Sequence, residues 1–135
     1  MSRRTVVVFH YNRVLMLLAI LEKRLGMDFG TQDVYVNVVG GARVTEPAAD
    51  LAVIAAIVSS YRNKPVMPGI LAVGEVGLTG EVRRVGFVER RIKEAQNLGF
   101  QKFVTPTGNL SAKSLPTGII QVNTVEEALA AFFEK

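Results

Sequence analysis

Segments with strand-like and helix-like patterns alternate along the whole of this chain. β-branched and aromatic side chains favour strands in five runs: 3–9, 33–39, 70–73, 102–105 and 119–122. Apolar spacing and capping residues predict helices in four: 12–25, 46–61, 87–98 and 124–133. Gly77 and Gly80 punctuate a hairpin turn after the third strand. The order predicts an α/β fold, with helices packed on a mixed sheet.

Length and composition restrict the chain to few classes. With 135 residues and 49% hydrophobic side chains, it can bury the core of one domain, expected to span 1–135. The apolar runs are shorter than the roughly 18 residues of a membrane span, so no membrane partner is expected. There is no cysteine, which excludes disulfides and thiol chemistry and favours a cytoplasmic protein. No phosphate-binding loop motif occurs, and no cofactor is expected within the chain.

Four titratable residues are candidates for catalysis or metal binding. His10 has no second imidazole with which to share a metal, so a structural role is expected. Glu46 and Asp50 are spaced to share a helix face, where they could bind a metal or form an acid–base pair. Without nearby histidine or cysteine, helix capping by Glu46 and a buried polar contact for Asp50 are favoured. Glu75, in a glycine-framed turn, is expected to accept backbone N–H groups.

Basic residues are concentrated in one part of the chain, which has a net charge of +4. Five of them fall within eleven positions: Arg83, Arg84, Arg90, Arg91 and Lys93. The helix here is expected to bury Val88, Ile92, Ala95 and Leu98. Arg90, Lys93 and Asn97 then face away from the core and could contact phosphates. The alternative, favoured by composition alone, is an ordinary solvated helix face that Glu89 and Glu94 partly neutralise.

Four segments, in order, carry a resemblance to a known family. They are 11–24, 33–41, 46–52 and 74–83. Across essentially its whole length, the sequence resembles the C-terminal Lon-like domain of the RadA (Sms) family of bacterial DNA repair and recombination ATPases. The resemblance implies the ribosomal-protein-S5-domain-2-like fold that this domain shares with Lon peptidases.

The same resemblance implies that the peptidase chemistry is lost. The serine of Lon lies in a Gly-Pro-Ser-Ala-Gly segment that matches 46–50, which places Ala48 at the nucleophile position. The lysine lies in a Gly-Gly-Leu-Lys segment that matches 86–89, which places Glu89 at the lysine position. A methyl group and a carboxylate supply neither nucleophile nor activating base. A cryptic hydrolase is the least favoured reading, since the other serines have no recognisable nucleophile context: Ser59, Ser60, Ser111 and Ser114.

Members of the RadA family also carry a four-cysteine zinc finger and a RecA-like ATPase core, and this sequence contains neither. We therefore expect a C-terminal piece of a longer protein, with ATP, magnesium and zinc bound by the parent. The resemblance further implies a hexameric ring, a RecA-type recombinase as partner of the parent, and a location at the bacterial nucleoid.

The leading hypothesis is a Lon-like domain that is not an enzyme, binds DNA and supports ring assembly of the parent in homologous recombination, branch migration and repair. The residues expected to contact phosphates, without base specificity, are Arg13, Arg43, Arg83, Arg84, Arg90 and Lys93. The alternative is a pure oligomerisation scaffold without DNA affinity, suggested by the alanine-rich helix at 46–61 and the ring-forming relatives.

Overall fold

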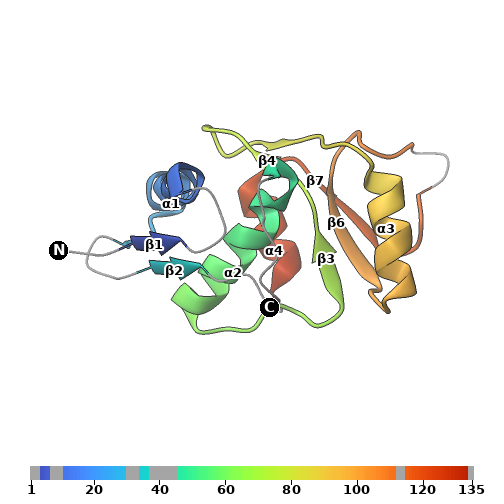
Figure 1. Cartoon of the computed structure of the whole chain (residues 1–135), viewed down its shortest axis with the longest axis horizontal. Coiled ribbons are helices and arrows are strands. Elements are labelled where there is room, and N and C mark those ends of the chain that lie inside the picture. Colours follow the sequence, from blue (N-terminus) through green and yellow to red (C-terminus); the bar gives the residue numbers. More distant parts are fainter. Residues whose placement is uncertain (1–3, 7–10, 30–33, 37–45, 112–114, 134–135) are drawn as a thin grey trace. The chain divides into compact units, whose positions relative to one another are not determined.

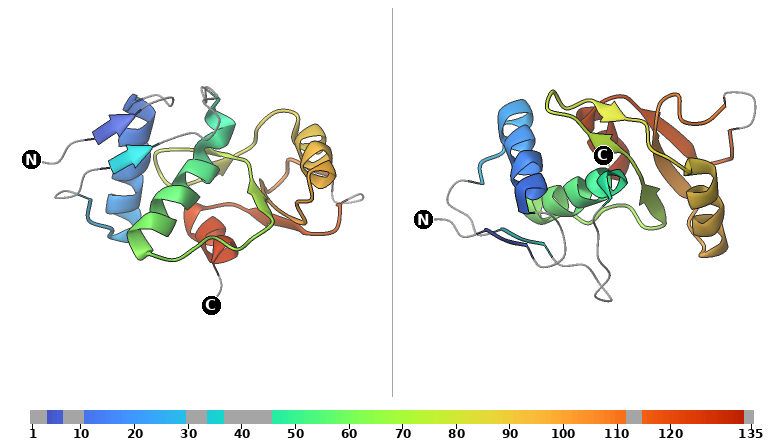
Figure 2. Two further views of the ribbon diagram at one scale, coloured as in Figure 1. Left: turned by 60° about the horizontal axis from the view of Figure 1, so that its bottom comes forward. Right: turned by 45° about the horizontal axis from the view of Figure 1, so that its top comes forward.

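The computed structural model describes residues 4–6, 11–29, 34–36, 46–111 and 115–133. The chain divides into two compact units, residues 1–46 and 47–135 (Figures 1 and 2). Each unit is an assembly of strands and helices, which confirms the predicted α/β class. His10 and Arg43 lie outside the described residues.

The first unit is a helix connecting two parallel strands. Strand β1 (Arg4–Val6) pairs in parallel with β2 (Val34–Val36), and helix α1 (Tyr11–Leu25) lies between them in the sequence. The apolar positions Val14, Leu17, Leu18 and Leu21 of α1 are buried, as the spacing predicts. The helix begins at Tyr11, so Asn12 lies inside it instead of capping it. It ends as expected, because Gly26 adopts a φ of 68° and its N–H donates to the Glu22 carbonyl.

The core of the second unit is a three-stranded parallel sheet with helices on both faces. The strand order is β3 (Ile70–Ala72), β6 (Lys102–Pro106) and β7 (Ile119–Val122). Helix α3 (Val88–Asn97) covers one face, where Ile92 and Ala95 join Phe103 in a buried cluster. Helices α2 (Asp50–Arg62) and α4 (Val125–Phe132) lie on the other face (Figures 1 and 2).

The predicted hairpin is present but forms a sheet of its own. Strand β4 (Glu75–Val76) pairs antiparallel with β5 (Val82–Arg83). Among the described residues, these two strands are not part of either parallel sheet, so three separate sheets stand in place of the one mixed sheet that the sequence predicted. The hairpin is fixed to the end of β7 by backbone bonds, since the Val82 N–H donates to the Asn123 carbonyl at 2.8 Å.

Helix α2 begins later than the sequence indicated. A short 3-10 helix, η2 (Pro47–Ala49), precedes it, and Glu46 lies before both. Glu46 and Asp50 therefore do not share a face of one α-helix, and the expected capping role of Glu46 at α2 is wrong. The buried polar contact predicted for Asp50 is confirmed, because its carboxylate is 0% exposed and accepts the Val76 N–H at 2.9 Å. Ala52 and Ala56 are exposed, so α2 is not buried all round.

Helix α3 is one residue shorter at each end than predicted, and the burial expected for Leu98 is wrong. Leu98 is the C-cap and is 80% exposed. Gly99, with a φ of 97°, turns the chain so that the Phe100 N–H donates to the Ala95 carbonyl at 3.0 Å. Phe100 consequently packs against the buried cluster in the place expected for Leu98. By contrast, the cap predicted at Thr124 is confirmed as a reciprocal capping box with Glu127.

Candidate nucleic-acid interface

The basic residues of the second unit lie on a continuous strand-to-helix segment, residues 83–93, which we call the basic segment. It runs from β5 through a short connection into α3. Arg83, Arg84, Arg90 and Lys93 are exposed, whereas Val88 and Ile92 are buried beneath α3. The predicted burial of Val88 and Ile92 and the exposure of Arg90 and Lys93 are therefore confirmed, and Glu89 and Glu94 are exposed on the same helix.

The Asn109 side chain fixes the connection between β5 and α3. Its Oδ1 accepts the Val85 N–H at 2.9 Å, and its Nδ2 donates to the Val85 carbonyl at 2.7 Å. Both backbone groups of Val85 are thus satisfied by one amide, which holds the connection as a neighbouring strand would. Asn109 belongs to a turn at residues 106–109, and the Arg84 side chain lies beside Gly108 of this turn. The turn at 106–109 consequently positions the middle of the basic segment.

The start of α3 is built around an unusual residue, Phe87. It is the N-cap, has left-handed backbone angles (φ 61°, ψ 31°) and makes no side-chain capping bond. Arg91 stabilises this turn, because its Nε donates to the Gly86 carbonyl at 2.9 Å. The Arg90 guanidinium lies 5.9 Å from the centroid of the Phe87 ring, within cation–π range.

Glu81 organises the hairpin turn that precedes the basic segment. Its carboxylate accepts hydrogen bonds from the Thr79 N–H at 3.1 Å and the Thr79 hydroxyl at 2.6 Å, and it pairs with Arg83 Nη2 at 3.0 Å. The Thr79 hydroxyl, the backbone of Glu81 and Arg83 lower the pKa of Glu81 to about 2. Glu75 lies in β4, so its expected place in the turn is wrong, and the carboxylate that accepts a backbone N–H within the turn is that of Glu81. A phosphate at Arg83 would compete with this ion pair.

Four of the six residues predicted to contact phosphates lie on the basic segment: Arg83, Arg84, Arg90 and Lys93. Arg13 lies in α1 of the first unit and is half-buried, with interactions of its own. These four residues therefore lie in one unit, whereas Arg13 belongs to the first unit and Arg43 lies outside the described residues.

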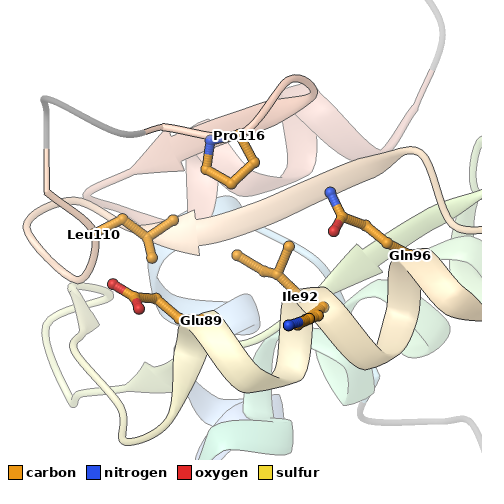
Figure 3. Close-up of a pocket in the computed structure, with 6 residues that line it drawn as sticks. Glu89, Ile92, Gln96, Leu110 and Pro116 are labelled. Carbon is orange, nitrogen blue, oxygen red and sulfur yellow. The ribbon is translucent and has the colours of Figure 1, made fainter.

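The positions matched to the Lon serine and lysine lie in different settings. Ala48 is buried in η2, and its carbonyl accepts the Gly74 N–H at 2.9 Å. Glu89 is exposed in the first turn of α3, at the edge of a hollow of about 290 Å³ (Figure 3). The described residues that line the hollow carry no hydroxyl, thiol or imidazole group: Glu89, Ile92, Lys93, Gln96, Leu110 and Pro116. Among the described residues, no three His, Cys, Asp or Glu side chains gather as metal ligands.

Sequence reasoning missed two residues of this site, Phe87 and Asn109. The glycine that precedes each of these residues indicates a turn. A turn motif does not show which distant residue the side chain in the turn contacts. The Asn109 bonds join residues 24 positions apart, which only the folded chain brings together. In the part of the chain that the structure describes, no helix is long and apolar enough to cross a membrane.

The second unit is therefore an α/β assembly that presents arginine and lysine side chains on a braced strand-to-helix segment. The chain belongs to the family described as Subunit ChlI of Mg-chelatase, whose model matches residues 3–109. It is also similar to proteins named DNA repair protein RadA, which confirms the resemblance read from its motifs.

Three of these relatives define the extent of the match. The chain is 48% identical to DNA repair protein RadA of Bacillus subtilis over 129 residues, which is 94% of the chain and 28% of the relative. The RadA protein of Halalkalibacterium halodurans is 46% identical over the same shares. That of Streptococcus pneumoniae is 46% identical over 134 residues, 98% of the chain and 32% of the relative. The chain thus spans about a third or less of these DNA repair proteins.

Proposed function

We propose that this chain is a Lon-like module, with the fold of ribosomal protein S5 domain 2, that binds DNA through its phosphates. The observation that carries the proposal is the basic segment, where Arg83, Arg84, Arg90 and Lys93 are exposed on a backbone held by Asn109. Phosphate contacts supply most of the affinity of sequence-independent DNA binding. The similarity to proteins named for DNA repair supports the same reading.

The module is proposed to act by binding, without peptidase chemistry. A serine nucleophile needs an oxygen and a base to take its proton, and Ala48 and Glu89 provide neither at the matched positions. The described residues that line the hollow beside Glu89 supply no hydroxyl or thiol to replace the missing serine.

We further propose that the module supports assembly of a longer RadA-type protein. The relatives are about three times the length of the match, and the resemblance implies an ATPase core and a zinc finger in the remainder. ATP, magnesium and zinc would be bound by that remainder. A hexameric ring, a RecA-type recombinase and a place at the bacterial nucleoid follow from the resemblance, with roles in recombination and branch migration.

Removal of charge from the basic segment tests the DNA-binding proposal. The double variant Arg83→Gln with Arg84→Gln is compared with Lys64→Gln with Lys102→Gln, which removes the same charge from exposed positions outside the segment. Fluorescence anisotropy with labelled double-stranded DNA at fixed low salt measures the affinity. Loss of two phosphate contacts should weaken binding about tenfold or more, while the control should change little.

Equal affinities for the two double variants would contradict the proposed surface. If the unmodified chain showed no affinity for DNA but sedimented as a ring, the oligomerisation scaffold would be the correct reading.

A further inference from the structure

Phe87 is a large aromatic side chain that the fold does not use. It is 73% exposed and lies outside the buried cluster formed by α3, β3 and β6. Its backbone has a φ of 61°, a conformation that glycine adopts without steric cost and that phenylalanine disfavours. Neither packing nor local conformation therefore accounts for a phenylalanine at this position.

The backbone just before Phe87 is fixed by two side chains, and one cation lies near the Phe87 ring. Arg91 bonds to the Gly86 carbonyl just before it, and Asn109 fixes Val85 two residues upstream. The Arg90 guanidinium lies 5.9 Å from the centroid of the ring. Because most of the ring stays exposed, a second planar group can stack on it.

We propose that Phe87 is a stacking platform for an unpaired base of single-stranded DNA, with Arg90 beside it for a flanking phosphate. The inference rests on the proposed function, since it assigns a form of DNA to the same basic segment. Aromatic side chains among cations are the means by which proteins bind single strands without sequence preference, because every base has a π face.

A single strand suits this ring better than a duplex does. The base faces of a duplex are covered by their neighbours, and only base edges reach the grooves. The face of Phe87 can meet the face of a base only where the bases are unstacked. Arg84, Arg90 and Lys93 could contact phosphates without an aromatic neighbour. Phosphate binding alone therefore does not explain the exposed phenylalanine at position 87.

The absence of tryptophan from the chain permits a direct test. Phe87→Trp places a single indole on the proposed platform, and Leu98→Trp places one on an 80% exposed residue at the other end of the same helix. Each variant is titrated with oligothymidylate while tryptophan emission and the anisotropy of the labelled oligonucleotide are followed. We expect quenching of the indole at position 87 and none at position 98.

The non-aromatic variant Phe87→Leu measures the contribution of the ring. Loss of one stacked base should weaken single-strand affinity about 5- to 150-fold, and this loss should exceed the loss of duplex affinity in the same variant. Phe87→Trp should retain the single-strand affinity, which separates stacking from a structural effect. Phe87→Gly should raise the melting temperature, because glycine adopts the left-handed backbone conformation without steric cost. The same variant should weaken the affinity for single-stranded DNA.

Two results overturn the inference and are distinguishable from each other. Binding of both DNA forms by the unmodified chain, with no quenching at position 87 and no loss in Phe87→Leu, would reject the platform and leave the proposed function standing. No binding of either form, even at low salt, would reject the inference together with the proposed function.

Discussion

The hydrogen-bond donors to the Glu81 carboxylate lie within two residues of it on either side. Thr79 and Arg83 supply four donor contacts to its carboxylate. An added Cβ at Gly77 would overlap the Glu81 carboxyl group, so a larger residue there would displace the carboxylate from its donors. The turn is therefore a local electrostatic unit, and it depends on the charge of one side chain.

This charge gives a prediction for pH. The folded-state pKa of Glu81 is about 2, below the ordinary value of 4.5, so the ionised form is favoured by folding. Its contribution to stability is full above pH 4.5 and is lost as the pH falls through about 2. Glu81→Gln should therefore melt below the unmodified chain at pH 7, and the gap should close between pH 4.5 and 2.

Thermal unfolding followed by circular dichroism across that range measures the gap. Glu94→Gln removes the same charge from an exposed position on α3 and serves as the control. A gap for Glu81→Gln that stayed constant down to pH 2 would show that ionisation of Glu81 is not the cause.

Thr105 presents the opposite case, a polar atom without a described partner. The residue is 0% exposed in the central strand β6, and its Oγ1 has no hydrogen-bond partner among the described residues. Burial of an unpaired hydroxyl costs about 1–3 kcal/mol, and valine has nearly the same shape. Thr105→Val should raise the free energy of unfolding by about 1 kcal/mol in urea titrations.

The matched variant is Thr79→Val, which removes a hydroxyl bonded to Glu81 and should lower the free energy of unfolding. If Thr105→Val were instead destabilising, the hydroxyl must be bonded in solution.

At the scale of elements, the connection from β5 to α3 depends on Asn109. Its amide is the described partner of both the N–H and the carbonyl of Val85. Asn109→Ala should lower the free energy of unfolding by about 1–3 kcal/mol, because it leaves partly buried backbone groups unpaired. The Val85 amide should also exchange its hydrogen faster, and DNA affinity should fall as the basic segment loosens.

Hydrogen exchange and urea titration of Asn109→Ala are compared with Asn97→Ala, which truncates an exposed amide on α3. Unchanged exchange at Val85 would mean that the connection holds without the Asn109 side chain.

Elements defined by nearby residues were predicted well, and those defined by distant contacts were not. The cap of α4 depends on Thr124 and Glu127, three positions apart, and the sequence displays both. Helix α2 starts at Asp50 without a side-chain cap, and the Asp50 carboxylate instead accepts the N–H of Val76, 26 positions away. The exposure of Leu98 follows from the left-handed turn at Gly99, which brings Phe100 to the core instead.

At the scale of the whole molecule, the alternation of patterns was sufficient to predict the α/β class, and the apolar spacing of α3 predicted which of its residues are buried. Pairing between strands was not predictable in the same way, since two-residue strands such as β4 and β5 carry too little pattern to assign them to a sheet. For the candidate site, the sequence identified the basic residues of segment 83–93 as one group. Their support by Asn109 and the exposure of Phe87 came only from the structure.

The central claim is that the basic segment binds DNA through its phosphates, and the salt dependence of binding tests it most directly. Anisotropy of labelled double-stranded DNA is titrated with the chain at several salt concentrations. Each phosphate contact contributes about −0.9 to the slope of log affinity against log salt, so four contacts predict a slope of about −3 to −4. The double variant Arg83→Gln with Arg84→Gln should reduce it by about 1.8. A slope near zero, or equal slopes for the two proteins, would contradict the account.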